Sequence, residues 1–310
     1  MTDRCPGTFE IIRAYGLLAM VVPLTISTAI AVIVTGGFNL SGLLLAAVVG
    51  FSIHISMNVY NDIYDTKQGC DTLDSGESIF SGGSAVMVKD PGLEGKLFTI
   101  ARAGLVVGLL GTLGLLYISE RELWPVFIFI FLAAAFLSKY YTAEPVKLAY
   151  RGLGEISIWL GFGPFAILLG AAAQGIPFHP LVITIMPATG LSTLIFAWGG
   201  QIVDMPYDRK AGKLGLVIRL GGLKSGTYGL MVLHAMLITN IIFAAYVFSN
   251  GWILILALVP YIALLPKVFA LLMTGMEIRE NVYEGARLNF FSFVVFSVTI
   301  MAGFFLMAVM

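Results

Sequence analysis

Nine apolar stretches run through the sequence, and they constrain its fold more than any single motif does. They span residues 15–35, 42–61, 103–118, 124–138, 156–173, 181–199, 228–248, 252–273 and 288–309. About 20 helical residues are needed to cross the roughly 30 Å hydrocarbon core of a bilayer. We therefore predict an all-α integral membrane protein, a bundle of nine transmembrane helices forming a single domain over residues 1–310.

The composition excludes a purely soluble protein. Hydrophobic residues make up 58% of the chain and charged residues only 12%, whereas soluble domains carry about 25% charged residues. The 18 Lys and Arg residues balance 18 Asp and Glu residues, so no bulk charge favours nucleic acid and we expect no such partner. The two cysteines, Cys5 and Cys70, are too few for a disulfide framework and are expected to be free thiols.

Charge sidedness tests the helix count, because the third and fourth stretches are short. With a cytoplasmic N-terminus, every Lys and Arg falls on the cytoplasmic side except Lys267, inside the eighth stretch, and Arg121. Such an excess of cations marks the cytoplasmic side of a membrane protein. The pattern predicts nine spans, an external C-terminus and a plasma-membrane protein whose active site faces the cytoplasm.

Two acidic clusters follow the second and sixth stretches. Helical spacing puts Asn61 with Asp65, and Asp204 with Asp208, on shared faces where each helix leaves the membrane. An even number of helices separates the clusters, so both emerge on one side, and the match is a weak internal repeat. Converging carboxylates repel one another unless a cation lies among them, and oxygen ligands without His or Cys suit Mg²⁺.

Two other interpretations remain open. Acids at helix ends can be ordinary solvated boundary residues, and acids in membrane proteins can mark the ion pathway of a cation-coupled transporter. Transporter sites tend to lie near the middle of the membrane, whereas these acids lie among Lys and Arg at its surface. That mixture favours an anionic diphosphate bound through metal.

Nearly the whole chain resembles the UbiA superfamily of intramembrane prenyltransferases, and within it most closely the 1,4-dihydroxy-2-naphthoate prenyltransferases of menaquinone synthesis. Four passages carry the resemblance: Asn61–Asp71, Phe80–Ser84, Tyr140–Glu155 and Asp208–Gly221. Two departures concern the acceptor. The third acid of the first motif comes late, as Asp71 after Gly69, and Leu214-Gly215 replaces the usual Arg-Thr of the second.

The resemblance implies a nine-helix bundle that transfers a polyprenyl group from its diphosphate to an aromatic acceptor with Mg²⁺. The expected partners are the polyprenyl diphosphate, the aromatic acceptor and the lipid bilayer. Other acceptors stay open: 4-hydroxybenzoate, homogentisate, a glycerol phosphate lipid or a porphyrin.

The resemblance also implies roles for individual residues. The expected metal ligands are Asn61, Asp62, Asp65, Asp71, Asp204 and Asp208. Ionisation of an allylic diphosphate needs charge neutralisation as the bond breaks, and the cations expected to contact it are Lys67, Lys147, Arg151, Lys210 and Lys213. Positive-inside anchoring to lipid headgroups is the competing explanation for these cations.

Four further features have two readings each. Tyr141 is expected either to act in catalysis, by shielding the allylic cation with its aromatic face, or to be an interfacial anchor. Glu155 either complements a helix dipole or acts in catalysis. His54 is expected to be a buried, hydrogen-bonded core residue in preference to a base, and Ser81–Ser84 is expected to be a turn or an oxyanion-binding loop.

Overall fold

The structure is a computed structural model that describes residues 11–72, 86–275 and 278–310. The described part is helical and contains no strand. Its membrane-length α-helices are α2 (Leu18–Thr35), α3 (Leu40–Lys67), α5 (Glu94–Ile118), α6 (Trp124–Tyr140), α9 (Pro180–Lys210), α11 (Leu223–Val247), α12 (Trp252–Thr274) and α13 (Arg279–Val309). A further span is built from α7 (Gly154–Leu160), a π-helical segment (Gly161–Phe165) and α8 (Ala166–Ala173).

Short helices connect these spans. They are the 3₁₀ segments Ala14–Leu17, Pro91–Leu93, Arg121–Leu123 and Leu148–Arg151, and the one-turn helices α4 (Val86–Lys89) and α10 (Leu216–Arg219). Within the described residues, nine helical segments are long and apolar enough to cross a membrane, which confirms the predicted number.

Four predicted spans are clearly longer in the structure than their apolar stretches, and one of them, the ninth, begins at Arg279 instead of residue 288. The third begins at Glu94 instead of residue 103, because exposed Lys96 and Arg102 lie on its first turns and lower the local hydropathy. The second and sixth continue to Lys67 and Lys210, so the acidic motifs are helical. Their polar residues are accommodated because they face one another and not lipid.

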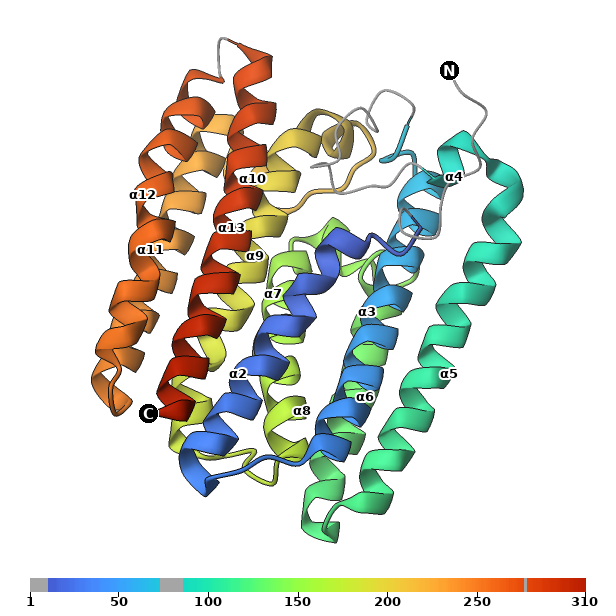
Figure 1. Ribbon diagram of the computed structural model, residues 1–310. Coiled ribbons are helices and arrows are strands. Elements are labelled where there is room, and N and C mark those ends of the chain that lie inside the picture. The colour runs from blue at the N-terminus through green and yellow to red at the C-terminus, as the bar shows by residue number, and fades with distance from the viewer. Residues whose placement is uncertain (1–10, 73–85, 276–277) are drawn as a thin grey trace.

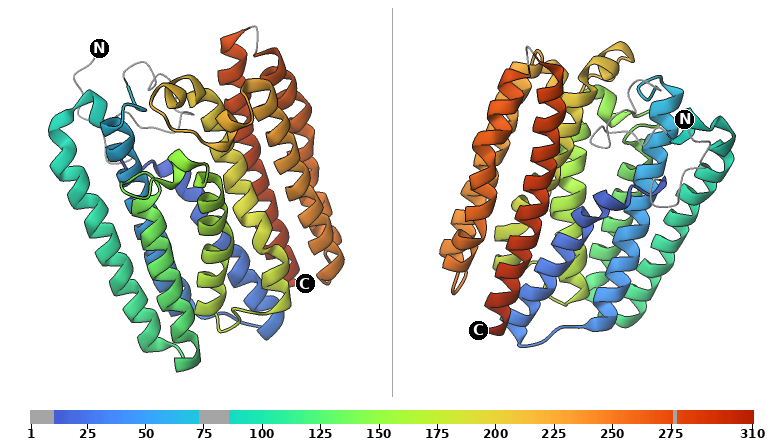
Figure 2. Two further views of the ribbon diagram at one scale, coloured as in Figure 1. Left: turned by 180° about the vertical axis from the view of Figure 1, so that it is seen from behind. Right: turned by 45° about the horizontal axis from the view of Figure 1, so that its top comes forward.

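The helices form a bundle with a buried centre and a more exposed periphery. In the most apolar 18-residue stretch of the span α7–α8, and of helix α9, 61% is buried, against only 17% in the corresponding stretch of the span that contains α6. Helix α2 packs on α8 and α13, α3 packs on α5 and α8, and α9 packs on α11 and α13. Figure 2 shows α5 and α6 along one flank, and α11 to α13 along the other.

The acidic ends of α3 and α9 lie at the same end of the bundle, and the C-terminus lies at the opposite end (Figure 1). This agrees with the even number of helices between the two motifs. The correspondence of the two halves as a repeat, and the orientation of the bundle in a membrane, stay predictions.

Candidate active site

The two acidic helices end in the same way, and this turn places a lysine. Gly69 and Gly212 each lie two residues beyond their helix and have positive φ of 78° and 73°, a conformation that glycine adopts without steric cost. The next residue then bonds back to the helix, Cys70 N to Asp65 O and Lys213 N to Asp208 O, both at 2.9 Å. In the second motif this reversal directs Lys213 to the carboxylates.

Lys213 joins the two motifs. Its Nζ lies 2.8 Å from Asp65 Oδ2 on α3 and 3.6 Å from Asp208 Oδ1 on α9. Burial alone would lower the pKa of Lys213, but Asp208 and Asp65 outweigh burial and raise it well above its usual value. The ammonium group is therefore the cation that holds these two buried carboxylates together.

Asp65, in the first motif, accepts hydrogen bonds from two further side chains. It accepts a hydrogen bond from Asn61 Nδ2 at 3.0 Å, which confirms the predicted shared helical face. It also accepts one from the Tyr150 hydroxyl at 2.9 Å. Tyr150 in turn lies 3.0 Å from Cys70 Sγ, and burial raises the pKa of that thiol to about 12.

Asp62 forms an ion pair with Arg13, a residue that precedes the first span. Arg13 has a left-handed φ of 50°, and its segment is held on α3 by a bond from Asn58 Nδ2 to Ile12 O at 3.1 Å. A non-glycine residue in this conformation is strained and is kept only where its surroundings impose it. From the sequence, Arg13 was counted only as one of the cytoplasmic cations. No sequence signal shows that it pairs with Asp62.

Asp71 follows α3, and its Oδ2 is buried without a hydrogen-bond partner among the described residues. Burial, with the charges of Asp65 and Asp62, raises the pKa of Asp71 to about 7. Asp62 is paired with Arg13 and Asp65 with Lys213, whereas Asp71 Oδ2 forms no such pair among the described residues.

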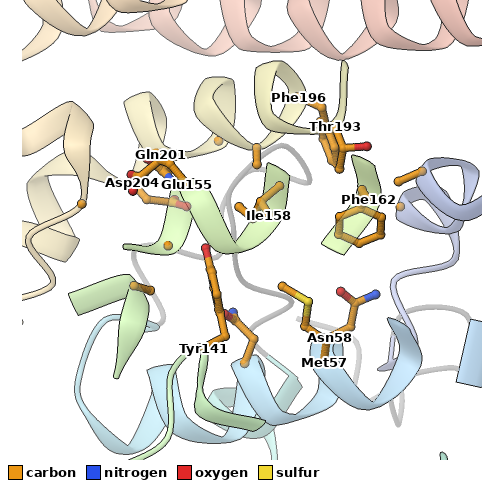
Figure 3. Close-up of a pocket in the computed structure, with 18 of the residues that line it drawn as sticks. Met57, Asn58, Tyr141, Glu155, Ile158, Phe162, Thr193, Phe196, Gln201 and Asp204 are labelled. Atoms are coloured by element: carbon orange, nitrogen blue, oxygen red, sulfur yellow. The ribbon is translucent and has the colours of Figure 1, made fainter. Parts of the chain in front are cut away.

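A cavity of about 150 Å³ lies beneath these groups. Five predicted site residues line it: Asn61, Tyr141, Asp204, Asp208 and Lys213. The lining also includes four polar residues that were not predicted as ligands: Arg13, Asn58, Glu155 and Gln201. Figure 3 shows Glu155, Gln201 and Asp204 gathered at one end and Phe162, Thr193 and Phe196 at the other, with the Tyr141 hydroxyl pointing toward the acidic end.

A second cavity, of about 50 Å³ and almost wholly apolar, adjoins the first. The two share His54, Met57 and Phe162. Phe162 lies in the π-helical segment, which includes Pro164 and so lacks one backbone donor. His54 is buried as predicted, against the Phe162 ring, but its Nδ1 has no hydrogen-bond partner among the described residues.

The remaining predicted cations lie outside the cavity lining and contact other groups. Lys67 pairs with Glu94 at 2.5 Å, and Lys147 pairs with Glu144 at 2.8 Å and lies over the Tyr150 ring. Arg151 is exposed and donates to Pro145 O at 2.9 Å, and Lys210 is exposed. Cys5 and the whole Phe80–Ser84 passage, including the loop Ser81–Ser84, lie outside the described residues.

Comparison with known proteins supports the family. Residues 20–277 match the model of the UbiA prenyltransferase family. A 2-carboxy-1,4-naphthoquinone phytyltransferase of Synechocystis is 29% identical, over 71% of this chain and 68% of its own. A 1,4-dihydroxy-2-naphthoate octaprenyltransferase of Mycobacterium tuberculosis is 28% identical, over 64% of this chain and 68% of its own.

The fold agrees with solved structures as well. A UbiA homologue from Archaeoglobus fulgidus, solved bound to GPP and Mg²⁺, superposes with a TM-score of 0.62 at 15% identity, covering 97% of this chain and 99% of its own. At that identity the likeness concerns the fold. Since the family model covers most of the chain, the protein belongs to the UbiA prenyltransferase family.

Proposed function

We propose that the protein transfers a polyprenyl group from its diphosphate to 1,4-dihydroxy-2-naphthoate, with Mg²⁺, at the cytoplasmic face of the plasma membrane. The observation that carries this proposal is the convergence of two acidic helix ends, through Lys213, over a polar cavity that adjoins an apolar one. A substrate with an anionic head and an isoprenoid tail matches that pairing of environments.

The donor set fits Mg²⁺, which prefers oxygen ligands. Asn61, Asp62, Asp65, Asp71, Asp204 and Asp208 would hold it. Within the described residues, no three carboxylates already converge as a metal cage. In the structure Lys213 and Arg13 pair with Asp65 and Asp62. When bound, Mg²⁺ supplies charge neutralisation for the departing diphosphate.

The chain's own residues supply the rest of the chemistry. Displacement of Lys213 from Asp65 would leave its ammonium group close to both motifs, where it can donate to diphosphate oxygens. The Tyr141 ring lies in the cavity lining and offers an aromatic face to the allylic cation. The apolar cavity holds the first part of the tail and keeps water from the cation.

The choice of acceptor rests on the relatives. Two of them carry naphthoate or naphthoquinone in their names, and the Tyr150–Glu155 passage with the late Asp71 belongs to the same resemblance.

The test is a product assay with purified protein in lipid nanodiscs. Mg²⁺ and a polyprenyl diphosphate are supplied with 1,4-dihydroxy-2-naphthoate, 4-hydroxybenzoate or homogentisate, and products are identified by mass spectrometry. We expect the naphthoate to have the highest kcat/KM. A better rate with 4-hydroxybenzoate would refute the naphthoate assignment alone, whereas absence of diphosphate release with every acceptor would refute the prenyltransferase assignment and favour a transporter.

A further inference from the structure

Two buried acceptor oxygens at one end of the cavity have no hydrogen-bond partner among the described residues. They are Glu155 Oε2 and Gln201 Oε1. Both side chains line the cavity, and Figure 3 shows them beside each other. Glu155 is only 2% exposed. Buried polar atoms in native proteins are nearly always hydrogen-bonded, so this end of the cavity calls for a ligand that brings hydrogen-bond donors.

The other oxygen of Glu155 fixes the carboxylate in place. Glu155 Oε1 accepts a hydrogen bond from Leu216 N at 2.8 Å. That bond ties the start of α7 to the segment that follows the second acidic motif. One oxygen is therefore structural, and the second, Oε2, is left buried without a partner among the described residues.

Gly215 keeps this end of the cavity open. A Cβ at that position would lie 3.0 Å from Glu155 Oε1 and 3.6 Å from Gln201 Oε1. The Glu155 and Gln201 side chains thus both lie next to Gly215, and any larger residue at position 215 would crowd them. Gly215 is one of the two positions at which this chain departs from the usual second motif.

The chemistry of the two oxygens selects between the substrates. A prenyl diphosphate presents acceptor oxygens and negative charge, and the Glu155 carboxylate would repel it. A phenolic acceptor presents O–H donors. A carboxylate on the same ring would be repelled from Glu155 and attracted to Lys213 and Arg13, which line the same cavity.

We propose that Glu155 Oε2 and Gln201 Oε1 form the hydroxyl-binding subsite for the aromatic acceptor, and that Glu155 accepts the hydroxyl proton. This inference rests on the proposed prenyl transfer. As the allylic C1–O bond breaks, its electron pair leaves with diphosphate. A ring carbon ortho or para to the hydroxyl bonds to C1, the hydroxyl oxygen becomes a carbonyl, and its proton moves to Glu155. Loss of carbon dioxide from the attacked carbon, or of a proton from it to water, then leaves the aromatic phenolate, which takes its proton back from Glu155.

The variant Glu155→Gln tests the subsite with little structural change. Its amide oxygen can still accept from Leu216 N, while its NH₂ replaces the acceptor oxygen that faces the cavity. We expect kcat/KM for the hydroxylated acceptor to fall about 10- to 100-fold, as for loss of one hydrogen bond to a charged group. The half-saturating concentrations of Mg²⁺ and of the prenyl diphosphate should stay the same.

An acceptor analogue whose hydroxyl is O-methylated separates hydroxyl binding by Glu155 from a purely structural role of that residue. The quantity measured is the inhibition constant of the analogue. Its inhibition constant should differ by less than about twofold between wild type and Glu155→Gln, because it offers Glu155 no donor. The matched control is Glu122→Gln, an exposed acid in the segment before α6, which should behave as wild type.

Several outcomes would overturn the inference. An unchanged kcat/KM for the hydroxylated acceptor in Glu155→Gln, or an equal loss for the methylated analogue, contradicts the subsite. A raised Mg²⁺ requirement would assign Glu155 to the metal site instead. If wild type prenylates no phenolic acceptor at all, the proposed function itself fails. That failure can be told apart from failure of the subsite, because it is seen in wild type and not only in the variant.

Discussion

Removal of the Lys213 ammonium group should destabilise the metal-free protein. In Lys213→Met the side chain keeps its approximate length and loses its charge. Asp65 and Asp208, which are 1% and 6% exposed, would then face each other without the cation that lies 2.8 and 3.6 Å from them. Removing one partner of a buried ion pair costs about 3–5 kcal/mol.

The lower end of that range applies here. Asp65 keeps its hydrogen bonds from Asn61 and Tyr150 in the variant, and these continue to stabilise its charge. We therefore expect a loss of about 3 kcal/mol, which corresponds to a fall in Tm on the order of 5–10 °C.

Mg²⁺ should restore much of this loss, since a metal ion among the carboxylates replaces the missing ammonium charge. The assay is thermal unfolding of purified protein in detergent, with Mg²⁺ and with EDTA. Mg²⁺ should raise the Tm of Lys213→Met more than that of wild type. Lys224→Met, which removes an exposed cation from α11, is the control and should match wild type in both conditions.

Two results would refute the reasoning. If Lys213→Met loses no more stability than Lys224→Met, the two carboxylates do not depend on the ammonium group. If Mg²⁺ stabilises wild type and Lys213→Met equally, the metal does not bind where Lys213 now lies, and the assigned ligand set is wrong.

Three further predictions concern the metal, the tail and the membrane. Asp65→Asn and Asp204→Asn should each lower turnover by orders of magnitude, measured by prenylated product, while the protein stays folded. Near-normal Mg²⁺-dependent rates in both variants would contradict the metal assignment. Gly161→Leu should fill the apolar cavity, because Gly161 lines it and a Cβ there meets nothing within 4 Å. We expect kcat/KM to fall about tenfold or more for long prenyl donors and little for GPP. An equal loss for both lengths would place the tail elsewhere. A tag at Ser75 should be cytoplasmic and one at Asn250 external, and labelling of Asn250 from the cytoplasmic side would invalidate the orientation.

The helical fold could be predicted from the sequence because hydropathy acts residue by residue. Each apolar stretch must leave water regardless of its neighbours, so nine spans are visible before any packing is known. Helical periodicity is local too, and it correctly paired Asn61 with Asp65. The same spacing placed both acidic motifs on helices, but the residues at which α3 and α9 end, Lys67 and Lys210, were not visible in the sequence.

The arrangement of the site was decided by tertiary structure. The motif residues Asp65 and Asp208 were identifiable, but nothing local shows that Lys213 turns back between them, or that Arg13 crosses to Asp62. Lys147 and Arg151 look equally suited to bind diphosphate, yet their partners lie in their own loop.

At the acidic end of the cavity, too, the role of a residue depends on tertiary packing. Glu155 reads as an ordinary acid at a helix start, and only packing shows that one of its oxygens is used by Leu216 while the other remains beside Gln201. Sequence determined which residues are polar and which segments enter the bilayer, because these follow from each side chain's own free energy of transfer. Tertiary structure decided which charges meet, because pairing depends on distances between helices that are far apart in the chain.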